Sequence, residues 1–75
     1  MDVKVAFGSV LRDIRTRRNF SQEQMALECD LDRTYISLLE RGKRQPTLAT
    51  VFRLAAVLDV PASEMIDETQ KRLLG

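Results

Sequence analysis

The stretch SQEQMALECDLDRTYISLLER, residues 21–41, decides the fold because it contains two helix starts separated by a short turn. Ser21 is followed three residues later by Gln24, which is the capping-box pattern of a helix N-terminus. In that arrangement each of the two side chains binds a backbone N–H that the helix leaves free. We therefore expect a short first helix over about Gln22–Cys29.

The second helix of this stretch starts after Asp32, because an aspartate at the N-cap binds free N–H groups and suits the helix dipole. It is expected over about Arg33–Arg41, and Gly42 suits the left-handed position that ends many helices. The residues between the two helices, 29–31, predict a tight turn, in which Asp30 tolerates a left-handed backbone better than most residues. Two short helices joined by such a turn meet the geometric requirement of a helix-turn-helix.

Three further helices are expected around this pair. Apolar residues recur at helical spacing over about Val3–Arg18. Thr47 is a suitable N-cap for a helix that ends near Asp59. A last helix is expected over about residues 61–74, with Pro61 in its first turn. No strand pattern or repeat accompanies them, so the sequence predicts an all-α fold, a compact single domain of five helices.

The core is expected to form from the apolar positions of these helices, which recur at the spacing of one helix face. These positions are Val3, Phe7, Val10, Leu11, Ile14, Met25, Ala26, Cys29, Ile36, Leu39, Leu48, Val51, Phe52, Ala55 and Leu58.

The composition limits the classes of function. The chain has 75 residues, 44% of them apolar and 31% charged, which is typical of one small globular domain. It contains no histidine, and its three glycines are far apart, which argues against a histidine base, a histidine metal ligand and a glycine-rich phosphate loop. Cys29 is the only cysteine and suits a small core position within a helix. We expect no enzyme activity, no cofactor and no metal site.

The location of the protein is expected to be cytoplasmic. No apolar run approaches the roughly 20 residues that cross a membrane, and the first residues do not resemble a secretion signal. A single cysteine excludes an internal disulfide and favours a reducing compartment. We expect no membrane partner and no small-molecule ligand.

Charge is distributed unevenly along the chain. Residues 12–53 contain nine Lys and Arg and six Asp and Glu, whereas residues 54–75 contain two Lys and Arg and four Asp and Glu. The formal net charge of +1 is a weak argument for nucleic-acid binding, but a basic region followed by an acidic one suits a DNA-binding face and a remainder that points away from it. Scattered solvated charge remains the alternative.

The sequence resembles the Cro/CI-type (XRE) helix-turn-helix family. The resemblance runs from about Phe7 to Met65 and rests on LRDIRTRRNFSQEQMA and LDRTYISLLERGKRQPTLATVFRLAAVLDVP. It implies a lambda-repressor-like fold that binds a double-stranded DNA operator as a homodimer. Within the family, the chain is most similar to the small controller proteins of restriction–modification systems, which often carry DRTYIS.

The resemblance and the chemistry of the side chains together predict the base-reading residues. Arg33 is the best candidate, because an extended guanidinium fits guanine O6 and N7, although a phosphate contact or a pair with Asp32 is the alternative. Thr34 offers a methyl group to thymine and a hydroxyl to a base or phosphate. Ser37 lies one turn after Arg33, where it can orient that guanidinium or touch the DNA. Leu38 stands where some relatives carry a polar base reader.

The resemblance also implies contacts with the DNA backbone from the start of the helix over Gln22–Cys29, from the helix over Arg33–Arg41 and from the loop that follows. The six residues are Gln22, Tyr35, Arg41, Lys43, Arg44 and Gln45. A helix N-terminus binds anions, and each phosphate contact makes binding more dependent on salt. Tyr35 is equally suited to packing in the core, and a basic loop can also be merely solvated.

Two further sets of residues follow from the resemblance. Arg15 and Glu40 match an ion pair that family members bury between the first helix and the end of the recognition helix. A homodimer interface is expected at the last helix and the end of the preceding one, from Val60, Ala62, Met65 and Ile66. The alternative for Met65 and Ile66 is that they complete the core of one protomer.

Other functions remain open. An antitoxin of a toxin–antitoxin pair shares this fold, but only DETQKRLLG follows the expected core here, which is short for a segment that wraps a toxin. A phage Cro or CI-like repressor uses the same chemistry in another circuit. The expected function is an autoregulatory transcriptional regulator that binds a two-fold operator.

Overall fold

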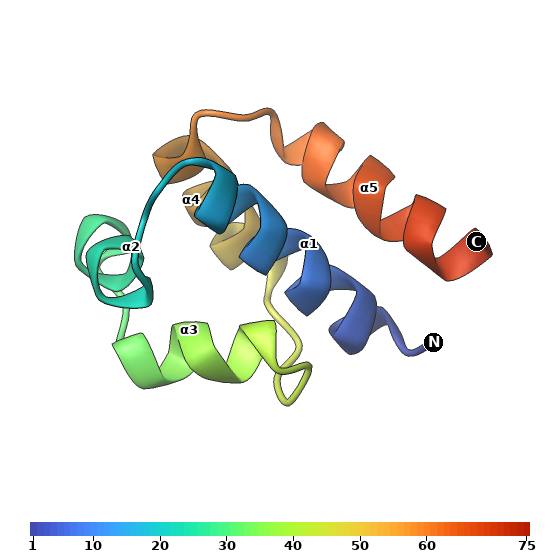
Figure 1. Cartoon of the computed structure of the whole chain (residues 1–75), viewed down its shortest axis with the longest axis horizontal. Helices are drawn as coiled ribbons and strands as arrows, with labels where there is room; N and C mark the ends of the chain where they lie inside the picture. Colours follow the sequence, from blue (N-terminus) through green and yellow to red (C-terminus); the bar gives the residue numbers. More distant parts are fainter.

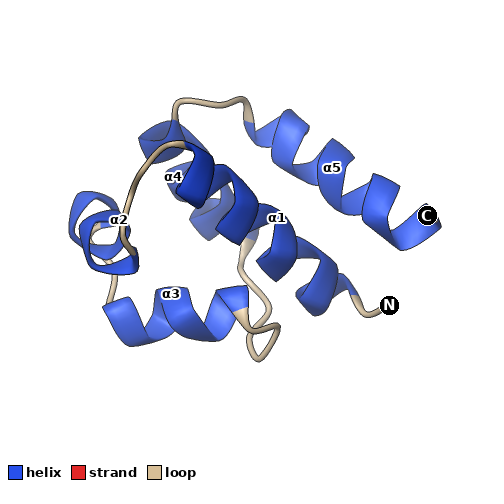
Figure 2. Ribbon diagram, in the orientation of Figure 1, coloured by secondary structure: helices blue, strands red, loops and turns tan.

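Five helices form the chain, and the computed structural model describes all of residues 1–75 (Figures 1 and 2). They are α1 (Val3–Arg17), α2 (Gln22–Cys29), α3 (Arg33–Glu40), α4 (Leu48–Leu58) and α5 (Ala62–Leu74). The predicted five-helix, all-α fold is confirmed. None of the helices combines the length and the apolar character that crossing a bilayer requires.

Helix starts follow the predicted caps. The Ser21 hydroxyl accepts from the Gln24 N–H at 3.0 Å, and the Gln24 side chain accepts from the Ser21 N–H at 3.0 Å, so the capping box is complete. The Asp32 carboxylate accepts from the Thr34 N–H at 2.9 Å. Thr47 caps α4 in the same way. These side chains satisfy N–H groups that the helices cannot, which is why the starts could be located from local sequence.

Helix ends differ slightly from expectation. Both α1 and α3 end one residue earlier, because Arg18 and Arg41 are C-caps rather than helical residues. Pro61 lies at the N-cap of α5 and not in its first turn. Gly42 has a φ of 70°, as expected for the residue that ends α3. Asp30 takes the left-handed conformation at φ 55°, so the turn between α2 and α3 forms without a glycine.

The core lies around α1, which packs against α3 on one side and α5 on the other (Figure 1). Most of the predicted core residues are buried, and Leu54 joins them although it was not predicted. Val51, Leu54, Ala55 and Leu58 form the buried stripe of α4 at the spacing expected for one helix face.

Three residues predicted to lie in the core are exposed instead. The exposed fractions are 46% for Val3, 68% for Leu48 and 59% for Phe52. Phe52 directly follows Val51 and is therefore turned about 100° away from the buried stripe. Val3 and Leu48 lie in the first turns of their helices, where they line a hollow beside α5 that nothing in the protomer fills. The apolar pattern therefore overestimated the core and included surface residues.

Candidate nucleic-acid interface

Helix α3 is anchored by one face and open on the other. It lies along one edge of the molecule, opposite α5 (Figure 1). Ile36 and Leu39 are fully buried in the shared core, whereas Arg33 and Thr34 are exposed. The connection from α2 consists of three residues, 30–32, which fixes the direction in which α3 leaves the core. The N-terminal end of α3, called its front below, is therefore exposed, while the buried face fixes the helix on the core.

The exposed side of α3 carries a shallow polar hollow of about 220 Å³. Its lining consists of Arg33, Thr34, Ser37 and Arg41, with no apolar residue. The structure therefore brings the three predicted base readers together, and it adds Arg41, which was expected at the DNA backbone. Two guanidinium groups and two hydroxyl groups supply donors that suit base edges and phosphates.

Arg33 is free to meet a ligand. It makes no hydrogen bond or ion pair in the structure. The carboxylate of Asp32 caps α3 at the Thr34 N–H, so the alternative of an Asp32–Arg33 pair is not the arrangement found. All five N–H donors of the Arg33 guanidinium remain available.

Ser37 turns toward the other end of the helix. The Nε–H of Arg41 donates to Ser37 Oγ at 3.2 Å and to the Ser37 carbonyl at 3.4 Å. The Ser37 hydroxyl, expected to orient Arg33 or to touch the DNA, makes its hydrogen bond with the guanidinium of Arg41 one turn later and makes none with Arg33.

Glu40 holds the end of α3 in place. Its carboxylate accepts from Arg15 Nε at 2.5 Å and from Arg15 Nη2 at 3.0 Å, and the two side chains are only 10% (Arg15) and 3% (Glu40) exposed. The same Arg15 guanidinium donates to the Phe20 carbonyl at 2.7 Å in the loop between α1 and α2. Hydrogen bonds to charged groups are the stronger kind, so this cluster fixes three elements relative to one another.

Gln22 belongs to the same cluster. Its side-chain amide donates to Glu40 Oε1 at 3.0 Å, and the residue is half-buried at the first position of α2. One amide N–H is used in this contact, and the other N–H and the carbonyl oxygen remain. The side chain predicted to contact a phosphate is thus held in position by the end of α3, which the sequence did not indicate.

The remaining predicted backbone contacts lie in and after α3. Tyr35 is half-buried and packs against the core, so its ring serves the scaffold. Lys43, Arg44 and Gln45 are exposed in the loop between α3 and α4. Gly42 starts this loop.

Gly8 is a structural requirement that sequence reasoning missed. A Cβ atom at this position would lie 2.2 Å from the Leu39 carbonyl oxygen and 2.8 Å from the Glu40 carbonyl oxygen. Helices α1 and α3 therefore cross so closely that only glycine fits at the crossing. A lone glycine inside an otherwise apolar helix pattern is the signal that could have revealed it.

Cys29 is a core residue. Its side chain is buried, and burial raises the pKa of its thiol, although the nearby positive charge of Arg53 acts in the opposite direction. A buried thiol that stays protonated is a poor nucleophile.

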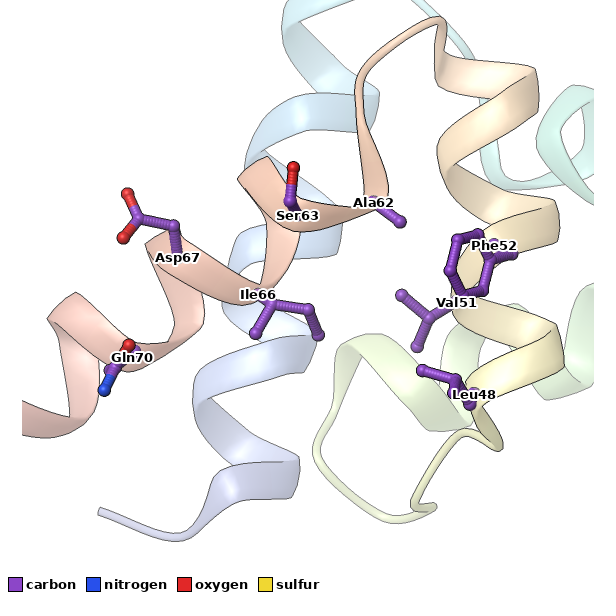
Figure 3. Close-up of a pocket in the computed structure, with 8 residues that line it drawn as sticks. All are labelled: Leu48, Val51, Phe52, Ala62, Ser63, Ile66, Asp67 and Gln70. Atoms are coloured by element: carbon purple, nitrogen blue, oxygen red, sulfur yellow. The ribbon is translucent and has the colours of Figure 1, made fainter.

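A separate apolar groove lies between α4 and α5, away from the polar hollow. It measures about 610 Å³, and Figure 3 shows Leu48, Val51 and Phe52 of α4 on one wall and Ala62 and Ile66 of α5 on the other. Ser63, Asp67 and Gln70 complete the lining along α5.

The residues predicted for the dimer interface fall into two groups, those that line the groove and those that pack in or against the core of the protomer. Ala62 and Ile66 line the groove, whereas Met65 is fully buried in the core of the protomer and has no surface to offer a partner. Val60 is half-buried against the core and outside the groove lining. Leu48 and Phe52 were assigned to the core, and the structure places them on this surface instead.

The comparisons with known proteins agree with this geometry. A family described as Helix-turn-helix matches residues 11–65. The control protein C.BamHI of Bacillus amyloliquefaciens is 41% identical over 69 residues, which are 91% of this chain and 85% of that protein. The control protein C.MunI of a Mycoplasma species is 38% identical over 93% of this chain and 96% of that protein.

Solved structures similar to this chain include controller proteins as well. The restriction–modification controller protein C.AhdI from Aeromonas hydrophila is 40% identical and superposes with a TM-score of 0.81, over 83% of this chain and 94% of that one. The controller protein C.Esp1396I, solved as a tetramer with its natural 35 base-pair operator, superposes with a TM-score of 0.88 at 28% identity, over 100% of this chain and 99% of that one. The resemblance to controller proteins is confirmed, and this chain belongs to the helix-turn-helix family.

Proposed function

We propose that the protein is a sequence-specific DNA-binding transcriptional regulator that binds a two-fold operator as a homodimer in the cytoplasm. The observation that carries this proposal is the unpaired Arg33 beside Thr34 in a polar hollow, on a helix whose opposite face is buried. A rigid helix with free donors on one face is what reading base edges in the major groove requires.

Base reading is assigned to the front of α3. The free guanidinium of Arg33 can donate two hydrogen bonds to guanine O6 and N7, a contact worth about 1–3 kcal/mol of discrimination. Thr34 lies beside it and is exposed, so its methyl group can contact a thymine methyl. The N-terminal residues of a recognition helix are the ones that contact bases in this docking geometry.

Contacts with the DNA backbone are assigned to residues around the N-terminal end of α3 and in the loop after this helix. Lys43, Arg44 and Gln45 follow α3 in an exposed loop, and Gln22 lies at the start of α2, where the helix dipole favours a phosphate. The hydroxyl of Tyr35 is a further candidate, because its ring is only half-buried. Contacts of this kind set the orientation of the protein on DNA but carry no sequence information.

Dimerisation is assigned to the groove between α4 and α5. Leu48, Phe52 and Ile66 expose large apolar side chains there, and a small domain rarely leaves such a surface uncovered. A two-fold contact through this groove leaves α3 of each protomer free, and the two helices can meet successive major grooves about 34–36 Å apart. Ala62 and Ile66 are retained from the predicted interface, and Leu48 and Phe52 replace Met65.

The regulated circuit is assigned by similarity. The relatives C.BamHI and C.MunI are control proteins, and C.AhdI and C.Esp1396I are restriction–modification controllers. We therefore assign this chain to the autoregulatory control of a restriction–modification system. The alternative of an antitoxin predicts a tight complex with a neighbour-encoded protein, which co-purification would reveal.

The proposal is tested by selecting bound DNA from a random pool with the purified protein. The expected result is one enriched sequence with two-fold symmetry, protected as two half-sites in footprinting. A pool that stays unenriched while the protein is folded would contradict sequence-specific binding. Enrichment of a single half-site without symmetry would contradict the dimer.

A further inference from the structure

Ser37 and Arg41 are joined by three hydrogen bonds near the C-terminal end of α3. The Arg41 Nε–H donates to Ser37 Oγ at 3.2 Å and to the Ser37 carbonyl at 3.4 Å, and the Arg41 backbone N–H donates to the Ser37 carbonyl at 3.0 Å. We propose that Ser37 is a positioning residue that holds Arg41 for a phosphate of the operator, and that it does not itself read a base. This inference rests on the proposed function and assigns one of its contacts.

The hydrogen bond leaves the outer edge of the Arg41 guanidinium free. Only Nε takes part in hydrogen bonds, and Nη1 and Nη2 have no partner in the structure. Two coplanar nitrogens of this kind fit two oxygens of a phosphate. The Nε end of the Arg41 guanidinium is therefore held by Ser37, while Nη1 and Nη2 remain free to bind an anion.

The place of Arg41 along the helix favours a phosphate over a base. It lies eight residues after Arg33, which corresponds to about 12 Å along a helix axis. The N-terminal residues of a recognition helix contact the base edges. The C-terminal end of the helix then lies nearer the DNA backbones that border the major groove. Arg41 also directly precedes the basic loop, so its neighbours in the interface are the other backbone contacts.

A guanidinium that is already hydrogen-bonded within the protein loses less conformational entropy when it binds a phosphate. An exposed arginine gives up many rotamers when it binds, and a hydrogen bond already present in the free protein reduces that cost. Lys43 is exposed in the same basic segment and its side chain makes no hydrogen bond or ion pair. The hydroxyl of Ser37 should therefore affect the contribution of Arg41 and not that of Lys43.

The test is a double-mutant cycle on the selected operator, read as binding affinity by fluorescence anisotropy at several salt concentrations. We expect Ser37→Ala to weaken binding about threefold to tenfold for each protomer of the dimer, the range of one net hydrogen bond. In an Arg41→Ala background the same change should weaken binding by less than about twofold, because the group it positions is gone. Arg41→Ala itself should reduce the salt slope by about 0.9 for each protomer, and so by about 1.8 for the homodimer, which loses two phosphate contacts.

Two controls separate this role from a structural one. In a Lys43→Ala background, which removes one positive charge from the same segment, Ser37→Ala should keep its full effect. Ser37→Thr retains the hydroxyl and should bind within about twofold of the unmodified protein, since the hydrogen bond survives. Thermal unfolding of each variant verifies that the fold is intact.

A second arm repeats the selection from random DNA with Ser37→Ala. We expect an unchanged sequence preference, since phosphate contacts carry no sequence information. Relaxed preference at one base pair would show that Ser37 reads a base and would overturn the inference. An equal loss of affinity in all backgrounds, or no loss in any, would overturn it as well. None of these results contradicts the proposed function, because sequence-specific binding fails when the unmodified protein selects no operator.

Discussion

Arg15 of α1 and Glu40 at the end of α3 form a two-point ion pair, with Arg15 Nε 2.5 Å from Glu40 Oε2 and Nη2 3.0 Å from Oε1. Gln22 of α2 donates to the same carboxylate. The pair, with Gln22, thus connects the central helix of the core with both helices of the helix-turn-helix, and it holds α3 at its C-terminal end.

Removing the charge of Glu40 should destabilise the fold. Glu40→Gln leaves the guanidinium of Arg15 buried without a counter-charge, a change that typically costs about 3–5 kcal/mol. The free energy of unfolding from urea denaturation measures this cost. Asp13→Asn is the matched control, because the Asp13–Arg72 pair has a carboxylate that is 53% exposed and should cost less than about 1 kcal/mol. Equal losses for the two variants would contradict the role assigned to the buried pair.

Gly8→Ala should destabilise the protein although alanine normally favours a helix by about 1 kcal/mol over glycine. The added Cβ would lie 2.2 Å from the Leu39 carbonyl oxygen, so α1 and α3 must move apart. Overpacking of this kind costs about 1–3 kcal/mol, and the thermal midpoint should fall by several degrees. Gly75→Ala, at the end of the chain, should leave the midpoint unchanged. A midpoint that stays the same or rises for Gly8→Ala would show that the helices do not cross as closely as described.

Phe52→Glu should abolish the homodimer. The side chain is 59% exposed in the protomer and lines the groove between α4 and α5, so a charge there disrupts association and leaves the core of the protomer intact. Sedimentation at micromolar concentration should give twice the protomer mass of 8.6 kDa for the unmodified protein and a single protomer for the variant.

The control for this experiment is Leu27→Glu. Leu27 is 80% exposed on α2, outside the groove, and the variant should sediment like the unmodified protein. A Phe52→Glu variant that remains dimeric would exclude the groove as the interface. An unmodified protein that is monomeric with and without operator would exclude the dimer altogether.

The elements of the fold were predictable because their signals are local. The caps at Ser21, Asp32 and Thr47 act on N–H groups two or three residues away, so the sequence nearby is sufficient to locate a helix start. The left-handed turn at Asp30 is local in the same sense.

Burial was less predictable because it depends on which elements meet. Leu48 and Phe52 have the apolar character of core residues, yet the packing of α4 against α5 leaves them exposed. Met65 and Ile66 are neighbours with similar hydrophobicity, and only the direction of α5 decides that the first is buried and the second exposed. Apolar periodicity does not separate a core from an interface, since both bury apolar side chains.

The candidate site was predictable in its residue types and not in its internal contacts. Arg33 and Thr34 were predicted from the family resemblance and from their side-chain chemistry, which require them to be exposed, and both are exposed in the structure. The engagement of Ser37 with Arg41 and of Gln22 with Glu40 depends on rotamers and on contacts between helices, which a sequence pattern does not specify.

The central claim is that Arg33 reads a base from a rigidly held α3. Selection of bound DNA from a random pool, run side by side with Arg33→Ala and with Arg44→Ala as a charge-matched control, tests it most directly. We predict that Arg33→Ala loses preference at one base pair in each half-site, with a discrimination cost of about 1–3 kcal/mol, while Arg44→Ala weakens all sequences equally. If Arg33→Ala instead weakened every sequence to the same extent and left the preference unchanged, Arg33 would be a phosphate contact and the claim would be wrong.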